Sequence, residues 1–179
     1  MSVIVKEDGG TYEAPPLGLQ PAVCINVVDV GYHKNNFDKL QRKIVILWEL
    51  ETRKSDGSRF TMGKTYTASL NEKATLRKDL KSWRTRDFTP AELEGFDLEH
   101  VIGANCQLNL ISTDRNGKTY TNIDSVMPKA RNQDIQPETS KSFIPDWVKK
   151  MMDGALPPPV EGHAPAQGGG DEFSDDIPF

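Results

Sequence analysis

Stretches rich in β-branched and apolar residues recur five times in the first 128 residues and predict five β-strands. They cover residues 20–31, 40–52, 59–67, 106–112 and 118–127. The third stretch alternates between two faces with period two, as expected of a strand with one buried face. A Ser-Asp-Gly-Ser turn precedes this third stretch. The Asn-Gly pair before the fifth is the strongest hairpin signal in the chain.

The period changes between the third and fourth predicted strands. Leu76, Leu80 and Trp83 are spaced i, i+4 and i+7, which places them on one face of a helix. We expect this helix to run from about residue 72 to residue 84. A second, short helix is predicted to begin at residues 89–92, because Thr-Pro-Ala-Glu combines a capping Thr, a first-turn Pro and a Glu three residues after the cap.

Three strands, a helical segment and two further strands follow one another in the order found in the OB-fold, a small five-stranded barrel. The predicted fold class is therefore mainly β: a five-stranded OB-fold barrel, with one helix and a short second helix between its third and fourth strands. Residues 1–128 are long enough to form such a domain. Element order alone is also compatible with other small α+β domains.

The chain becomes polar and rich in Pro and Gly after residue 128, which predicts a linker over residues 129–170. Within it, residues 146–152 contain three apolar anchors and predict a short helix. Residues 156–170 have the composition of a disordered tail. The acidic residues 171–179 form a third, separate segment.

The overall charge of −4 does not argue against a nucleic-acid partner, because it is unevenly distributed. Residues 161–179 contain five acidic residues and no Lys or Arg, so they carry −5. Residues 1–160 therefore carry +1, the difference between −4 and −5. A near-neutral folded part can present a basic face to a polyanion.

Catalytic, metal and membrane signals are weak in this sequence. Cys24 and Cys106 lie in apolar strand-like runs and are expected to be small buried side chains. His33, His100 and His163 are scattered without ligand spacing, so no metal or cofactor is expected. No apolar run approaches about 20 residues, and the first residues do not resemble a signal peptide. We therefore expect a cytoplasmic protein without enzymatic activity.

Cations and flat side chains gather in the segments that line the cleft of an OB barrel. That cleft is formed by strands 2 and 3 and by the loops that join strands 1–2 and 4–5. Single-strand binding requires cations near phosphates and rings on which bases can stack. The candidate DNA-binding residues, in chain order, are Tyr32, Lys34, Phe37, Lys39, Arg42, Lys43, Trp48, Arg59, Phe60, Lys64, Tyr66, Arg115, Lys118 and Tyr120.

Each candidate also has a structural interpretation. Trp48 lies in an apolar run and suits a core, and Phe60 suits the barrel interior. Lys64 and Tyr66 share one face of the third strand, which leaves Tyr66 open to both roles. Phe37 lies in a polar loop and is the aromatic residue least easily explained by packing. The cations could be ordinary surface charges.

The acidic C-terminal segment, DEFSDDIPF, predicts a partner-docking motif. An aromatic residue beside its own free carboxylate, held on a Gly-rich tether, suits a pocket with an apolar floor and a basic rim. The predicted docking residues are Asp175, Asp176, Ile177, Pro178 and Phe179. The alternative is an acidic end that only maintains solubility.

The terminal DDIPF resembles the tail of bacterial single-stranded DNA-binding proteins, which recruit replication and repair enzymes through it. Over residues 1–128, the segments KATLRKDLKSWR and FDLEHVIG with the following hairpin resemble phage and prophage single-stranded DNA-binding proteins that have an OB-fold. The resemblance implies cooperative, sequence-tolerant binding in replication, recombination or repair, in the cytoplasm of a bacterial host cell. The segment between strands 3 and 4 is longer than in the housekeeping bacterial proteins, so their tetramer is not implied.

Three alternatives remain beside a protein that coats and protects single-stranded DNA. A recombination mediator or strand-annealing protein would use the same fold. A non-catalytic adaptor would use the barrel as a scaffold for proteins only. A nuclease is disfavoured, because the carboxylates are dispersed and no Gly-rich phosphate loop is present. The acidic tip could also occupy the basic cleft when DNA is absent.

Overall fold

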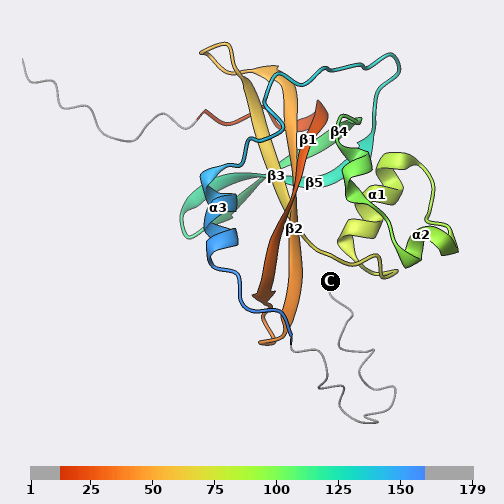
Figure 1. Cartoon of the computed structure of the whole chain (residues 1–179). Helices are drawn as coiled ribbons and strands as arrows, with labels where there is room; N and C mark the ends of the chain where they lie inside the picture. Colours follow the sequence, from red (N-terminus) through yellow and green to blue (C-terminus); the bar gives the residue numbers. More distant parts are fainter. Residues whose placement is uncertain (1–12, 160–179) are drawn as a thin grey trace, which may run out of the picture.

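The computed structural model describes residues 13–159 (Figure 1). Its strands are β1 (Gly18–Lys34), β2 (Leu40–Arg53), β3 (Arg59–Thr67), β4 (Asn105–Arg115) and β5 (Lys118–Pro128). Its helices are α1 (Thr75–Arg84), α2 (Pro90–Glu94), the 3-10 helix η1 (Leu98–Val101) and α3 (Asp146–Asp153). None of these helices is long and apolar enough to cross a membrane.

The five strands form one antiparallel sheet in the order β3-β2-β1-β4-β5, which confirms the mainly β prediction. The longest strand, β1, lies at the centre, and β3 and β5 form the two edges. Within residues 13–159 no hydrogen-bonded strand pairing joins these edges, so the sheet is not closed. They do approach one another, because Lys64 Nζ of β3 donates to the carbonyl of Asp124 in β5 at 3.3 Å.

The sheet curves because β1 is irregular. Its pairing with β2 shifts between Cys24 and Asn26 and again between Asp29 and Gly31. Bulges of this kind bend a strand and increase its twist. Gly31 has a φ of +81°, and a Cβ at this position would lie 2.7 Å from the Cβ of Ala155. Glycine is therefore required here both by the backbone and by a neighbouring segment.

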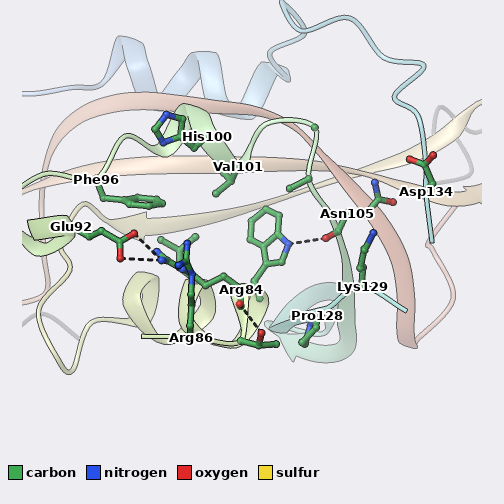
Figure 2. A pocket seen from close by; sticks show the side chains of 15 residues that line it. Arg84, Arg86, Glu92, Phe96, His100, Val101, Asn105, Pro128, Lys129 and Asp134 are labelled. Atoms are coloured by element: carbon green, nitrogen blue, oxygen red, sulfur yellow. Dashed lines mark hydrogen bonds and ion pairs between the residues drawn. The ribbon is translucent and has the colours of Figure 1, made fainter. Parts of the chain in front are cut away.

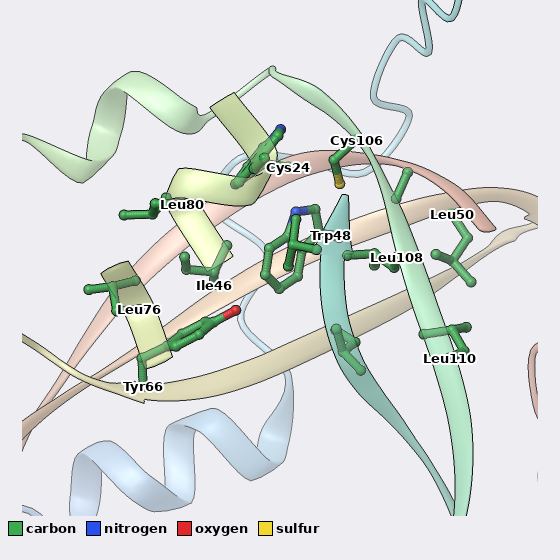
Figure 3. Packing of buried hydrophobic residues seen from close by; sticks show 14 of the residues in the cluster. Cys24, Ile46, Trp48, Leu50, Tyr66, Leu76, Leu80, Cys106, Leu108 and Leu110 are labelled. Atoms are coloured by element: carbon green, nitrogen blue, oxygen red, sulfur yellow. The ribbon is translucent and has the colours of Figure 1, made fainter. Parts of the chain in front are cut away.

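The main core lies between the concave face of the sheet and α1 (Figure 3). Leu76, Leu80 and Trp83 of α1 are buried, as predicted from their spacing. The Trp48 and Trp83 rings pack with their centroids 5.9 Å apart. The sheet contributes Ala22, Cys24, Ile44, Ile46, Trp48, Leu50, Phe60, Tyr66, Cys106, Leu108, Leu110, Ile123 and Val126.

The start of α2 agrees with the prediction, and the start of α1 differs from it by about three residues. α1 begins at Thr75 rather than near residue 72, and Ala74 precedes it without a side-chain cap. α2 has the predicted capping box, in which Thr89 and Glu92 exchange hydrogen bonds with each other's backbone N–H groups. Cys24 and Cys106 are free, buried thiols, as expected, and burial raises the pKa of Cys24 to about 12.

A second core covers the opposite face of β1 and β2. It contains Val23, Ile25, Val28, Val30, Val45 and Leu47 from the sheet, and Ile135 and Val148 from residues 133–156, which we call the C-terminal strap. The strap includes α3, in agreement with the helix predicted at 146–152. It ends where the N–H of Leu156 donates to the carbonyl of Tyr32 at 2.8 Å. The packed part of the chain therefore extends beyond the boundary predicted at residue 128.

Polar contacts fix the first half of the strap. Gln133 Nε2 donates to the carbonyls of Ala22 at 3.2 Å and Cys106 at 2.8 Å. The carboxylate of Glu49, completely buried in β2, accepts from the N–H groups of Glu138 and Thr139, each at 2.8 Å. Burial alone would raise the pKa of Glu49, but these hydrogen bonds hold it below its usual value. The charge is therefore retained inside the fold.

Candidate nucleic-acid interface

The hairpin of β1 and β2 presents an uncovered aromatic ring. Asn35 Oδ1 accepts from the N–H groups of Phe37 at 2.8 Å and Lys39 at 3.0 Å, which fixes the turn. Asp38 adopts the left-handed conformation with a φ of +63°. The side chain of Phe37 is 82% exposed, so this ordered turn holds a flat apolar surface in solvent. No packing role accounts for it.

The strands on either side of this turn carry cations, and some of these already have partners. Lys34 pairs with Asp38 at 3.0 Å, and Arg42 pairs with Asp29 at 2.6 Å. The hydrogen bond from Arg42 lowers the pKa of Asp29. Exposed pairs of this kind contribute only about 0–1 kcal/mol, so a phosphate can replace the carboxylate at little cost. Lys43 is less available, because burial lowers its pKa and its Nζ donates to Thr67 Oγ1 at 2.6 Å.

The hairpin of β4 and β5 carries unneutralised charge. Arg115 and Lys118 are opposite each other in the β4–β5 strand register, on either side of the turn. The turn residues Asn116 and Gly117 both have positive φ, as a type I′ turn requires. Within the described part of the chain, no carboxylate forms an ion pair with either cation. Tyr120, opposite Thr113, is exposed beside them. This hairpin therefore has two cations and a ring available to a ligand.

Trp48, Phe60 and Tyr66 do not belong to an accessible surface. All three are buried in the main core, and Trp48 and Tyr66 point into it in Figure 3. A base cannot stack on a ring whose faces contact the protein. Their burial argues against the prediction that they contact DNA and agrees with the core interpretation of Trp48 and Phe60. Alternation along β3 placed Phe60 and Tyr66 on one face without showing that this face is the inner one.

Lys64 and Arg59 are also occupied inside the fold. Lys64 Nζ lies 2.7 Å from the buried carboxylate of Asp79, which also accepts from the Tyr66 hydroxyl at 2.8 Å. Burial, followed by the neighbouring Asp79, raises the pKa of Tyr66. Arg59 donates to Glu49 at 3.2 Å and to the carbonyl of Gln136 at 2.8 Å. These cations stabilise internal acceptors and are removed from the candidate interface.

The outer face of β2 and β3 is covered by the strap. The indole of Trp147 lies against Gly63, where a Cβ would be 2.6 Å from Trp147 Cζ2. Thr65 Oγ1 donates to the sulfur of Met151 at 3.9 Å. Sequence reasoning missed this cover. The available signal was Gly63 itself, since a glycine inside a strand often marks the close approach of another group.

A separate cavity of about 780 Å³ lies beside α1, on the opposite side of the molecule from α3 in Figure 1. Trp83, Phe96 and Val101 form part of its wall (Figure 2). Arg84 pairs with Glu92 at 2.8 Å and lies over the ring of Phe96 at 5.4 Å. Its charge is therefore partly neutralised, and its side chain packs against the wall of the cavity.

The described residues contain no candidate metal site. Among residues 13–159, no three His, Cys, Asp or Glu side chains are grouped so that they could hold a metal ion. The predicted docking residues Asp175, Asp176, Ile177, Pro178 and Phe179 lie outside the described residues. The chain matches no protein-family model, and no curated protein is significantly similar to it in sequence.

Proposed function

We propose that this chain is a phage-type single-stranded DNA-binding protein built on an OB-fold barrel. The fold part rests on the strand order and on the edges β3 and β5, which the contact of Lys64 with Asp124 brings together. Pairing of these edges would complete a five-stranded barrel with a helix between its third and fourth strands. The predicted element order and the resemblance of residues 1–128 to phage proteins support the same proposal.

One observation supports the binding activity most directly: two ordered hairpins carry exposed rings together with accessible cations. Phe37 and Tyr120 offer flat surfaces, and Arg115 and Lys118 offer positive charge that no described carboxylate neutralises. Rings bind every base through its π-face, and cations follow the phosphates whatever the sequence. This combination suits sequence-tolerant binding of a flexible single strand.

In this proposal the protein coats and protects transient single-stranded DNA during replication, recombination or repair in a bacterial host cell. Its acidic tip recruits replication or recombination enzymes, with the Phe179 side chain as the apolar anchor. The negative charge of the tip also mimics phosphate, so the tip competes with DNA for the cations of the hairpins. A strand-annealing or mediator role on the same fold is distinguished by whether the protein accelerates pairing of complementary strands.

A specific observation favours a second candidate, the non-catalytic adaptor. The β2–β3 face on which OB-folds bind oligonucleotides is covered here by Trp147 and Met151. If DNA could bind only to that face, the covered barrel could not bind DNA and would bind proteins only.

Fluorescence anisotropy with labelled oligo(dT) and a duplex of equal length separates the two candidates. Tighter binding of oligo(dT) than of the duplex is expected for the proposed function. Absence of binding to either, at low salt, would support the adaptor. An annealing assay with complementary oligonucleotides then tests the mediator role.

A further inference from the structure

We propose that Trp147, with Lys150 beside it, is a base-stacking platform, and that single-stranded DNA passes over α3 rather than over the strands beneath it. This inference rests on the proposed function and specifies its binding surface. It also explains why a strap over the β2–β3 face does not abolish binding.

The indole of Trp147 contacts β3 and is also partly exposed to solvent. A Cβ at Gly63 would lie 2.6 Å from Cζ2 and 3.0 Å from Cη2 of this ring, so the ring lies directly on the backbone of β3. The side chain is nevertheless 43% exposed. A ring fixed against the sheet has already lost its rotational freedom, which reduces the entropic cost of stacking a base on it.

A cation lies next to this ring on the same side of the helix. Residues three apart on a helix are neighbours, and Lys150 follows Trp147 by three. Lys150 is exposed, and no described carboxylate forms an ion pair with it. The ring can stack on a base and the ammonium group can bind a phosphate, so the two side chains match the two parts of a nucleotide.

The strap is too firmly anchored to be displaced by DNA. Val148 is buried on the underside of α3, and Gln133 and Thr139 are hydrogen-bonded into the sheet. Lifting the strap would break the hydrogen bonds that Glu138 and Thr139 donate to Glu49 and would expose the apolar second core to water, which is strongly unfavourable. DNA therefore meets the outer surface of α3.

The strap that carries the platform reaches the β1–β2 hairpin. In Figure 1 the turn of the β4–β5 hairpin and α3 both lie to the left of β2. After α3 the strap reaches the β1–β2 hairpin, where Leu156 pairs with Tyr32. In the proposed path, single-stranded DNA contacts α3 and the cations and rings of the two hairpins.

The chain's three tryptophans make the proposal measurable without labelling the protein. Trp48 and Trp83 are 0% and 8% exposed, so acrylamide quenches mainly the fluorescence of Trp147. Saturating oligo(dT) is expected to protect this fluorescence from acrylamide in the unaltered protein. Binding seen by anisotropy without any protection would overturn the platform and leave the proposed function intact.

Substitutions provide the second arm of the test. Trp147→Leu keeps an apolar contact with Gly63 but removes the ring, and is expected to weaken oligo(dT) binding roughly 5- to 100-fold. Trp147→Phe should retain most of the affinity. Met152→Ala, a similarly exposed position on the other flank of α3, is the matched control and should bind like the unaltered protein.

Equal affinity of W147L and the unaltered protein would overturn the platform, as would an equal loss in M152A, which would indicate general disruption of α3. If W147L does not fold, the acrylamide measurement on the unaltered protein still tests whether Trp147 contacts DNA. Absence of oligo(dT) binding in the unaltered protein would instead contradict the proposed function itself.

Discussion

At the scale of single residues, Glu49 holds the strap to the sheet through a buried charge. Glu49→Gln preserves the shape but removes the charge that Arg59 and the N–H groups of Glu138 and Thr139 stabilise. We expect the free energy of unfolding, measured in urea, to fall by about 3 kcal/mol. Glu51→Gln, an exposed position on the same strand, should change it by less than about 0.5 kcal/mol. Similar effects for both would contradict this role.

Glu49 also gives stability a pH dependence of known sign. Its pKa in the folded protein lies below the ordinary value, so the unfolded chain takes up a proton first as the pH falls. Its contribution is therefore complete above the ordinary pKa of about 4.5 and is lost as the pH falls through the folded value. We expect the stability difference between the unaltered protein and Glu49→Gln to shrink between pH 6 and pH 3. A constant difference in urea denaturation across this range would contradict the assignment.

Gly63 tests the contact between α3 and β3. In Gly63→Ala the new methyl group would meet Trp147 at 2.6 Å and Leu47 at 2.9 Å, which forces the indole to move. Overpacking of this kind costs roughly 1–3 kcal/mol. Gly95→Ala is the control, because it has open space and an extended backbone. Thermal denaturation should show a lower midpoint for Gly63→Ala only, and equal midpoints would contradict the packing.

At the scale of elements, the β4–β5 hairpin provides a test of phosphate binding. Arg115→Ala and Lys118→Ala should weaken oligo(dT) binding and flatten its salt dependence, by roughly 0.7 in the log–log slope for each phosphate that the variant no longer neutralises. A double variant, Lys73→Ala with Lys78→Ala, removes the same amount of charge and is the control. Lys73 is exposed just before α1, and Lys78 is exposed within it. An unchanged slope in the hairpin variant would show that its cations do not bind DNA.

Elements with local sequence signals could be predicted, α3 among them, but the packing of the strap on the sheet could not. Period-two and period-3.6 patterns indicated the strands and the buried face of α1, and the Thr89 capping box indicated α2. The strap is polar and Pro-rich, and its anchors Gln133, Ile135 and Val148 follow no period. Their partners lie about 30 to 110 residues away, for example Ala22 for Gln133. Such contacts are fixed by tertiary packing.

Only part of the candidate site could be predicted from the sequence. The hairpin residues Phe37, Arg115 and Lys118 were identified because turn signals place them in loops, and loops are exposed. Alternation in β3 grouped Lys64 with Tyr66 correctly. It could not show that both face a buried carboxylate, Asp79, contributed by a helix that follows in the sequence.

At the scale of the whole molecule, the acidic tip should compete with DNA. Deleting residues 171–179 removes Asp171, Glu172, Asp175 and Asp176 and leaves the described fold unchanged in sequence. We expect tighter oligo(dT) binding at low salt, with the gain disappearing as salt screens the charges. Unchanged affinity at low salt would exclude competition by the tip, though not its docking to partners.

The central claim is that the described domain binds single-stranded DNA through cations and exposed rings. Anisotropy titration of labelled oligo(dT) over a salt series, with an equal-length duplex in parallel, tests it most directly. We expect preferential binding of the single strand, with an affinity that falls linearly on a log–log plot as salt increases. Binding that is absent, or insensitive to salt, or no tighter than binding of the duplex would contradict it.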